Sequence, residues 1–182
     1  MNINKFLKIS VLVCGSIVTA QTKSTISVDT KQPSSIISKH IYGHFAEHLG
    51  RGIYDGIYVG ENSKIPNSNG VRKDIINALK ELKIPNLRWP GGCFADTYHW
   101  KDGIGPKNLR PTIVNNWWGG NTEDNSFGTH EFLNLAEELG TEPYLAGNVG
   151  SGEVKELSDW VQYTGKDTKS PMTDLRKQNG RD

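Results

Sequence analysis

The sequence predicts an α/β protein that contains the first part of a parallel (β/α)₈ barrel. Between residues 40 and 182, a strand-like stretch followed by an amphipathic helix occurs three times. Such alternation is typical of a parallel sheet with helices packed outside it. The chain also returns from each helix to the next strand within a few residues, whereas the strands are followed by long loops at 46–70 and 90–128. This asymmetry favours a barrel over a doubly wound sheet, in which it is milder.

The spacing of apolar residues identifies each element. In the first helix, apolar side chains recur four, eight and eleven positions after Val71, and Pro85 then prevents the helix from continuing. Thr129 is a suitable N-cap for the second helix, which Gly140 ends, and Gly165 closes the third. The predicted strands are Ile41–Phe45, Asn86–Trp89 and Pro143–Asn148, the predicted helices are 71–83, 129–139 and 154–164, and a separate strand is expected at Thr25–Val28.

Three units cannot close a barrel of eight, which typically takes about 250 residues. We therefore expect residues 40–182 to be the N-terminal piece of a longer barrel. Residues 21–39 form an N-terminal strand and a polar linker, and residues 1–20 are a separate leader.

The first twenty residues have the composition of a secretory signal peptide. Lys5 and Lys8 precede a short apolar run at 9–18, and Ala20 ends a stretch of small residues. The run is too short to span a membrane, and a lipoprotein signal at Cys14 is disfavoured by the bulky Val13. These features predict export to the periplasm or the extracellular space, with no membrane attachment after cleavage.

Charge and cysteine content restrict the remaining chain. The whole sequence has 21 basic and 20 acidic residues, and loss of Lys5 and Lys8 leaves 19 against 20, a net charge of −1. Nucleic acid is therefore not an expected partner. Cys93 is the only cysteine after residue 20, so no internal disulfide can form.

The stretch YGHFAEHLGR contains an H-x-x-E-H pattern at His44, Glu47 and His48, which is the signature of one class of zinc peptidases. Zinc binding would require a helix that places both histidines on one face. The stretch follows a predicted strand, and in an extended chain the two histidines would lie about 13 Å apart, at about 3.3 Å per residue. A zinc site is therefore the weaker alternative.

Polar residues collect where the three predicted strands end. Glu47 follows the first strand, Arg88 and Cys93 flank the second strand's end, and Asn148 ends the third. In a barrel these ends share one opening, where active sites are built. Carboxylate, guanidinium and amide groups beside aromatic planes suit sugar recognition, and the aromatic residues proposed for the opening are Trp89, Trp100, Trp117 and Trp118.

Two alternatives, a phosphate ligand and non-catalytic carbohydrate binding, fit the sequence less well. The glycine-rich stretch at 147–152 could cradle phosphate, but it lacks the residue order of a nucleotide-binding loop. A non-catalytic carbohydrate-binding protein would present similar aromatic residues, although such modules are mostly β-sandwiches.

Three long motifs carry a family resemblance: IYGHFAEHLGRGIYDGIYVG, LRWPGGCFADTYHWKDGIGP and EPYLAGNVGSG. With the tail SPMTDLRKQNGRD, they resemble the N-terminal part of glycoside hydrolase family 51, the α-L-arabinofuranosidases. The resemblance covers about residues 36–182. It implies a (β/α)₈ barrel with a β-sandwich to which Thr25–Val28 would contribute, and homo-oligomeric assembly of the longer protein.

The resemblance also implies a retaining mechanism without metal or cofactor, in which an acid/base glutamate and a nucleophilic glutamate lie about 5–5.5 Å apart. In the family these residues end the fourth and seventh strands, so both are expected beyond Asp182. The substrate would be an arabinose-containing plant polysaccharide or oligosaccharide, whose linkage the sequence does not specify.

The resemblance also matches substrate-binding residues of the family to individual positions of this sequence. The resemblance assigns Glu47 to the arabinofuranose hydroxyls, Arg88 to the same pocket, and Trp118 to the leaving-group side. Cys93 stands where many members have an asparagine that contacts the sugar, and a thiol is a weaker hydrogen-bonding group. Asn148 completes the predicted set.

Overall fold

The computed structural model describes residues 23–31, 35–166 and 169–182, which divide into two units, 1–36 and 37–182. The leader predicted at residues 1–20 lies outside the described residues. In the described part of the first unit, Thr25–Val28 is not a strand, and Ile26 and Val28 are exposed. The predicted strand does not form in this structure, because a strand requires a hydrogen-bonded neighbour and no described residue pairs with this segment. Its pairing within a β-sandwich of the longer protein stays a prediction. Within the described ranges, no helix is both long enough and apolar enough to cross a membrane.

The second unit is built on a parallel sheet of three strands in the order β1-β4-β7. These strands are β1 (His44–Phe45), β4 (Asn86–Trp89) and β7 (Glu142–Leu145). The prediction of three parallel strands joined through helices is confirmed. β1 is shorter than expected because Lys39–Tyr42 form a 3₁₀ helix, η1, whose first turn is capped by the Ser38 side chain. β7 pairs with β4 only as far as Leu145, so it ends before Asn148.

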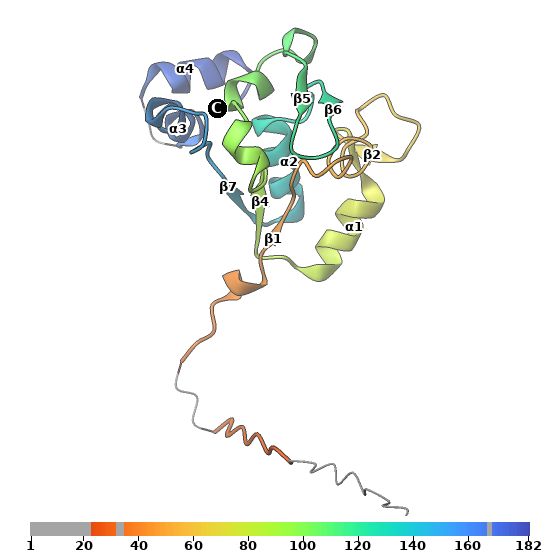
Figure 1. Ribbon diagram of the computed structural model, residues 1–182, viewed down its shortest axis with the longest axis vertical. Coiled ribbons are helices and arrows are strands. Elements are labelled where there is room, and N and C mark those ends of the chain that lie inside the picture. Colours follow the sequence, from red (N-terminus) through yellow and green to blue (C-terminus); the bar gives the residue numbers. More distant parts are fainter. Residues whose placement is uncertain (1–22, 32–34, 167–168) are drawn as a thin grey trace, which may run out of the picture. The chain divides into compact units, whose positions relative to one another are not determined.

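Among the described residues, four α-helices accompany the sheet (Figure 1): α1 (Lys73–Leu82), α2 (Thr129–Leu139), α3 (Val154–Thr164) and α4 (Pro171–Gln178). The first three were predicted. α1 starts two residues later than expected because Val71–Arg72, as β3, pairs with β2 (Asn67–Ser68). α4 was not predicted, although Ser170 as N-cap and Pro171 in the first turn are standard helix-start signals.

The core lies between the sheet and the helices. Along β4, Leu87 and Trp89 are buried while Asn86 and Arg88 are half-buried, as expected for a strand with one face packed. The ring of Trp89 stacks on Phe132 of α2 at 5.3 Å between centroids. Trp100 is also fully buried, against Trp160 of α3. The prediction that Trp89 and Trp100 line the opening is therefore wrong, because both rings fill the core.

The long loop between β4 and α2 is folded rather than irregular. It contains three 3₁₀ helices, η2 (Phe94–Thr97), η3 (Trp100–Gly103) and η4 (Lys107–Leu109), and a hairpin of β5 (Ile113–Asn115) and β6 (Asn121–Glu123). In Figure 1 this hairpin lies beyond the end of the sheet toward which β1 and β4 run. Loop structure therefore gathers at the carboxyl ends of the strands, where Glu47 and Arg88 are located.

Candidate functional site

Glu47 lies two residues beyond β1 and is held by the turn that follows β4. Its Oε1 accepts hydrogen bonds from the backbone N–H of Gly92 at 3.1 Å and of Phe94 at 3.4 Å. Gly91 has φ +149°, and a Cβ there would lie 2.5 Å from Cγ of Glu47. The turn therefore needs glycine at this position both for its backbone conformation and for the close approach of the glutamate.

Arg88 lies beside Glu47 on the open face of the sheet. It pairs in register with Phe45 and Tyr144, so the three side chains share the face opposite Leu87 and Trp89. The guanidinium carbon is 4.8 Å from the centre of the Phe45 ring. A Cβ on Gly92 would be 3.5 Å from an Arg88 guanidinium nitrogen and 3.9 Å from Oε1 of Glu47. The carboxylate and the guanidinium thus converge on one glycine of the turn.

The Arg88 guanidinium has an unsatisfied hydrogen-bond donor. Its Nε is buried and makes no hydrogen bond to any part of the chain that the structure describes. A buried donor without a partner is costly, and a ligand oxygen is one group that could satisfy it. Cys93 follows this turn, at the start of η2, and carries an exposed free thiol. The structure therefore brings Glu47, Arg88 and Cys93 together at the end of β4.

Trp118 comes from the loop between β5 and β6. Its side chain is half-buried, and the neighbouring Trp117 is half-exposed. The backbone N–H of Trp118 donates to Oδ1 of Asn115 at 3.1 Å, and Nδ2 of Asn115 donates to the carbonyl of His48 at 2.6 Å. The Asn115 side chain thus joins the loop that carries Trp118 to His48, the residue after Glu47.

Asn148 uses its amide to organise its own loop. Its Oδ1 accepts from the backbone N–H groups of Gly150, Ser151 and Gly152, at 2.9 to 3.1 Å. Its Nδ2 donates to Ser151 Oγ and to the carbonyl of Tyr98. These internal bonds also engage the backbone donors that a phosphate would need, so the glycine-rich stretch is not an open anion cradle. The amide of Asn148 is therefore committed to its own loop and to the carbonyl of Tyr98.

The H-x-x-E-H pattern does not form a metal site. His44 is exposed on β1, whereas His48 is fully buried. Nε2 of His48 accepts from the Trp89 indole at 3.0 Å, and Nδ1 lies 2.7 Å from Oε2 of Glu123. Both ring nitrogens are therefore engaged. Across the described ranges, no three His, Cys, Asp or Glu side chains are arranged to hold a metal ion.

Sequence reasoning missed Asn115 and Glu123, which surround His48. Both lie on the β5–β6 hairpin, and no pattern in the sequence indicated that this hairpin packs on His48. Tyr54 completes the surroundings, because its ring meets the His48 imidazole edge-on at 5.7 Å. Burial raises the pKa of the Tyr54 hydroxyl, and the nearby Glu123 acts in the same direction, so the phenol stays protonated.

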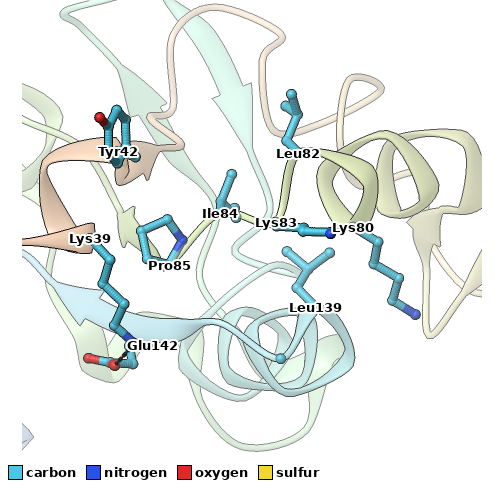
Figure 2. A pocket seen from close by; sticks show the side chains of 10 residues that line it. Lys39, Tyr42, Lys80, Leu82, Lys83, Ile84, Pro85, Leu139 and Glu142 are labelled. Carbon is cyan, nitrogen blue, oxygen red and sulfur yellow. Dashed lines mark hydrogen bonds and ion pairs between the residues drawn. The ribbon is translucent and has the colours of Figure 1, made fainter. Parts of the chain in front are cut away.

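A cavity of about 540 Å³ opens at the other end of the sheet (Figure 2). Its lining combines the end of α1 with residues that precede β1, β4 and β7. Lys39 and Glu142 form an ion pair at 3.0 Å on one side of the cavity. None of the predicted sugar-binding residues lines this cavity. The site around Glu47 lies at the opposite, carboxyl end of the strands.

Comparison with known proteins identifies relatives of this chain. A profile of the alpha-L-arabinofuranosidase 1 domain matches residues 78–182. An intracellular exo-alpha-L-arabinofuranosidase from Bacteroides ovatus is 65% identical over 163 residues, which are 90% of this chain and 32% of the relative. The crystal structure of the family 51 arabinofuranosidase of Xanthomonas axonopodis pv. citri superimposes with a TM-score of 0.81 at 52% identity, over 84% of this chain and 31% of that one.

An alpha-L-arabinofuranosidase of Thermotoga maritima in complex with arabinose gives a TM-score of 0.75 at 48% identity, over 80% of this chain and 30% of that one. The chain therefore spans about a third of the length of these relatives.

One expectation is contradicted by these relatives. The composition of residues 1–20 predicted export, but the Bacteroides ovatus relative, at 65% identity, is an intracellular enzyme. The prediction of an exported location is therefore wrong. A few lysines before a short apolar run are a weak indication of export, because they reflect only the composition of that short stretch.

Proposed function

Since the chain belongs to the α-L-arabinofuranosidases of glycoside hydrolase family 51, we propose that it forms the sugar-binding first third of such an enzyme. The enzyme would remove terminal non-reducing α-L-arabinofuranosyl residues from arabinose-containing polysaccharides or oligosaccharides. The observation that carries this proposal is the convergence of Glu47 and Arg88 on Gly92 at the end of β4. The arabinose complex of the Thermotoga maritima relative supports arabinose as the sugar.

The roles of the residues follow from their hydrogen-bonding capacity. The backbone of the turn holds Oε1 of Glu47, and among the described residues no group bonds its Oε2, which is free to accept from a sugar hydroxyl. The unpartnered Nε of Arg88 would donate to a ligand oxygen. Cys93 would contribute its exposed thiol to the same surface, and Trp118 would pack on the leaving-group side. Asn148 would act indirectly, by shaping the loop after β7.

The proposed architecture extends the observed sheet. The three parallel strands and their helices would be the first three units of a (β/α)₈ barrel, with residues 21–39 contributing a strand and a linker to a β-sandwich. The open row of Phe45, Arg88 and Tyr144 would then face the barrel interior. This arrangement agrees with the rule that barrel enzymes build their sites at the carboxyl ends of the strands.

The proposed chemistry is a retaining hydrolysis by two glutamates. One glutamic acid would protonate the leaving oxygen and the other would form a glycosyl-enzyme, with the two carboxyl groups about 5–5.5 Å apart. Both would come from the part of the enzyme beyond Asp182. The residues of this chain bind and orient the sugar. The name of the Bacteroides ovatus relative supports an intracellular location.

The test uses the full-length protein and an aryl α-L-arabinofuranoside. Proton NMR during hydrolysis should show the α-anomer of arabinose first, because a double displacement retains configuration. An initial β-anomer would contradict the retaining mechanism. Arabinose binding without any hydrolysis would instead identify a non-catalytic carbohydrate-binding protein.

A further inference from the structure

A buried chain of hydrogen bonds runs from β4 to the β5–β6 hairpin. Nε1 of Trp89 donates to Nε2 of His48 at 3.0 Å, and Nδ1 of His48 lies 2.7 Å from Oε2 of Glu123. Nδ2 of Asn115 donates to the other oxygen of Glu123, Oε1, at 2.9 Å. None of the four residues is more than 2% exposed. The sugar-binding roles proposed above do not account for this series of buried hydrogen bonds.

The direction of each hydrogen bond follows from the groups involved. An indole N–H can only donate, so Nε2 of His48 must accept and its Nδ1 must carry the proton. Glu123 then receives one donor on each oxygen, from His48 and from Asn115. The side chain between His48 and Asn115 must therefore accept a hydrogen bond from each of them. A carboxylate meets this requirement, whereas an amide of the same size presents a donor to one of the two neighbours.

The buried series of hydrogen bonds holds the backbone beside three of the predicted sugar-binding residues, Glu47, Arg88 and Trp118. The N–H of His48, next to Glu47, donates to the carbonyl of Pro90 at 3.2 Å. The His48 carbonyl accepts from Asn115 at 2.6 Å, and Asn115 in turn accepts from the N–H of Trp118 at 3.1 Å. Trp89, at the other end, follows Arg88 in β4. The residues that neighbour Glu47, Arg88 and Trp118 are thus joined in one buried unit.

We propose that His48, Asn115 and Glu123 are positioning residues that set the loop at 116–120 against Glu47. The loop then contacts the part of the substrate beyond the sugar that Glu47 binds. This inference rests on the proposed function. The three side chains are buried, so they act through the loop and the backbone of residue 48 and do not touch substrate. Their effect should therefore depend on how far a substrate extends from its terminal sugar.

The test replaces Glu123 by glutamine in the full-length protein. Glu123→Gln keeps the volume but turns a donor toward His48 or Asn115, which should release the loop. We expect KM for an arabino-oligosaccharide to rise about tenfold, which is the effect of losing one hydrogen bond to a charged group. We expect kcat for both substrates, and KM for a small aryl arabinofuranoside, to stay near the wild-type values. Glu123→Asp retains acceptors at both oxygens and should bring the oligosaccharide KM back toward the wild-type value. Glu81→Gln, at an exposed position on α1, is the matched control and should change nothing.

A merely structural role gives a different result. Loss of folded enzyme would lower kcat for both substrates equally and leave each KM unchanged, and this outcome would overturn the proposal. If Glu123→Gln does not fold, hydrogen–deuterium exchange on the wild type decides. The amide of Trp118 donates to Oδ1 of the Asn115 side chain, so it should be protected although the loop around it is exposed. Exchange at the rate of a free loop would overturn the proposal. An inactive wild type would contradict the proposed function itself, and the exchange experiment would still test the positioning unit.

Discussion

Oε1 of Glu47 lies 3.1 Å from the backbone nitrogen of Gly92 and accepts its hydrogen. A side chain that follows β1 is thereby fixed by the turn after β4, the neighbouring strand. One oxygen of the carboxylate accepts from the backbone, and the other has no hydrogen-bond partner among the described residues. The predictions for Glu47→Gln and Gly91→Ala follow from this arrangement.

Glu47→Gln should lower kcat/KM of the full-length enzyme on an aryl α-L-arabinofuranoside. The glutamine oxygen can still accept from Gly92, so the fold should survive, but the charged acceptor for the sugar hydroxyl is lost. A hydrogen bond to a charged group contributes about 1.5–3 kcal/mol, which corresponds to roughly ten- to 150-fold in kcat/KM. Steady-state kinetics on both proteins measure the effect, and unchanged kinetics would show that Glu47 is a bystander.

EDTA should leave the wild-type activity intact, because retaining glycosidase chemistry uses carboxylates. Loss of activity on chelation, with recovery on addition of zinc, would restore the interpretation of His44, Glu47 and His48 as a metal site.

Gly91→Ala should impair the same site although it replaces no functional side chain. The new Cβ would meet Cγ of Glu47 at 2.5 Å, and φ of +149° is a conformation that alanine rarely adopts. Displacing the carboxylate by about 1 Å can cost on the order of a hundredfold in activity. Gly60→Ala is the control, because Gly60 also has a positive φ but no atom within 4 Å of the added Cβ. Equal activity of the two variants would argue against a tightly held Glu47.

The 182-residue chain produced alone should not hydrolyse an aryl arabinofuranoside, since both proposed catalytic glutamates lie outside it. It should also self-associate. Phe45 and Tyr144 on the open face of the sheet are 60% and 57% exposed, and exposed apolar patches favour association. Activity assays and size-exclusion chromatography test both statements. A monodisperse chain with turnover would contradict the assignment of catalysis to residues beyond Asp182.

Acid should destabilise the packing of α2 on α3 through His130. Burial lowers the pKa of His130 below its ordinary value, and the nearby positive charge of Arg181 acts in the same direction. Tyr163 lies 2.8 Å from Nε2 of His130, a contact that suits the neutral ring as acceptor. The contribution of His130 to stability is therefore complete above its ordinary pKa of about 6.5 and is lost as pH falls through the lower folded-state value.

Thermal unfolding of the full-length protein between about pH 7 and pH 5, on either side of the ordinary histidine pKa, measures this effect. His130→Gln keeps an acceptor for Tyr163 but cannot titrate, so its melting temperature should fall less over this range. His44→Gln removes an exposed histidine and should keep the wild-type pH dependence. Identical pH profiles for all three proteins would show that His130 does not contribute.

Local patterns in the sequence were sufficient for several of the regular elements. The strand Asn86–Trp89 and the helix Val154–Thr164 have the predicted bounds, because apolar spacing and terminating glycines act over a few residues. The alternation of strands and helices also predicted the parallel sheet. Glu47 and Arg88 could be placed together for the same reason, since the ends of neighbouring parallel strands meet at one edge.

Only the tertiary structure decided which polar and aromatic side chains are buried. Trp89 and Trp117 are the same residue type, yet one fills the core and the other is half-exposed. His44 and His48 fit one motif, but His48 turns inward because Trp89 and Glu123 satisfy both of its ring nitrogens. Glu123 is 75 residues from His48 in the chain. A buried polar group is stable only where partners surround it, and partners so distant in sequence are brought together by the fold alone.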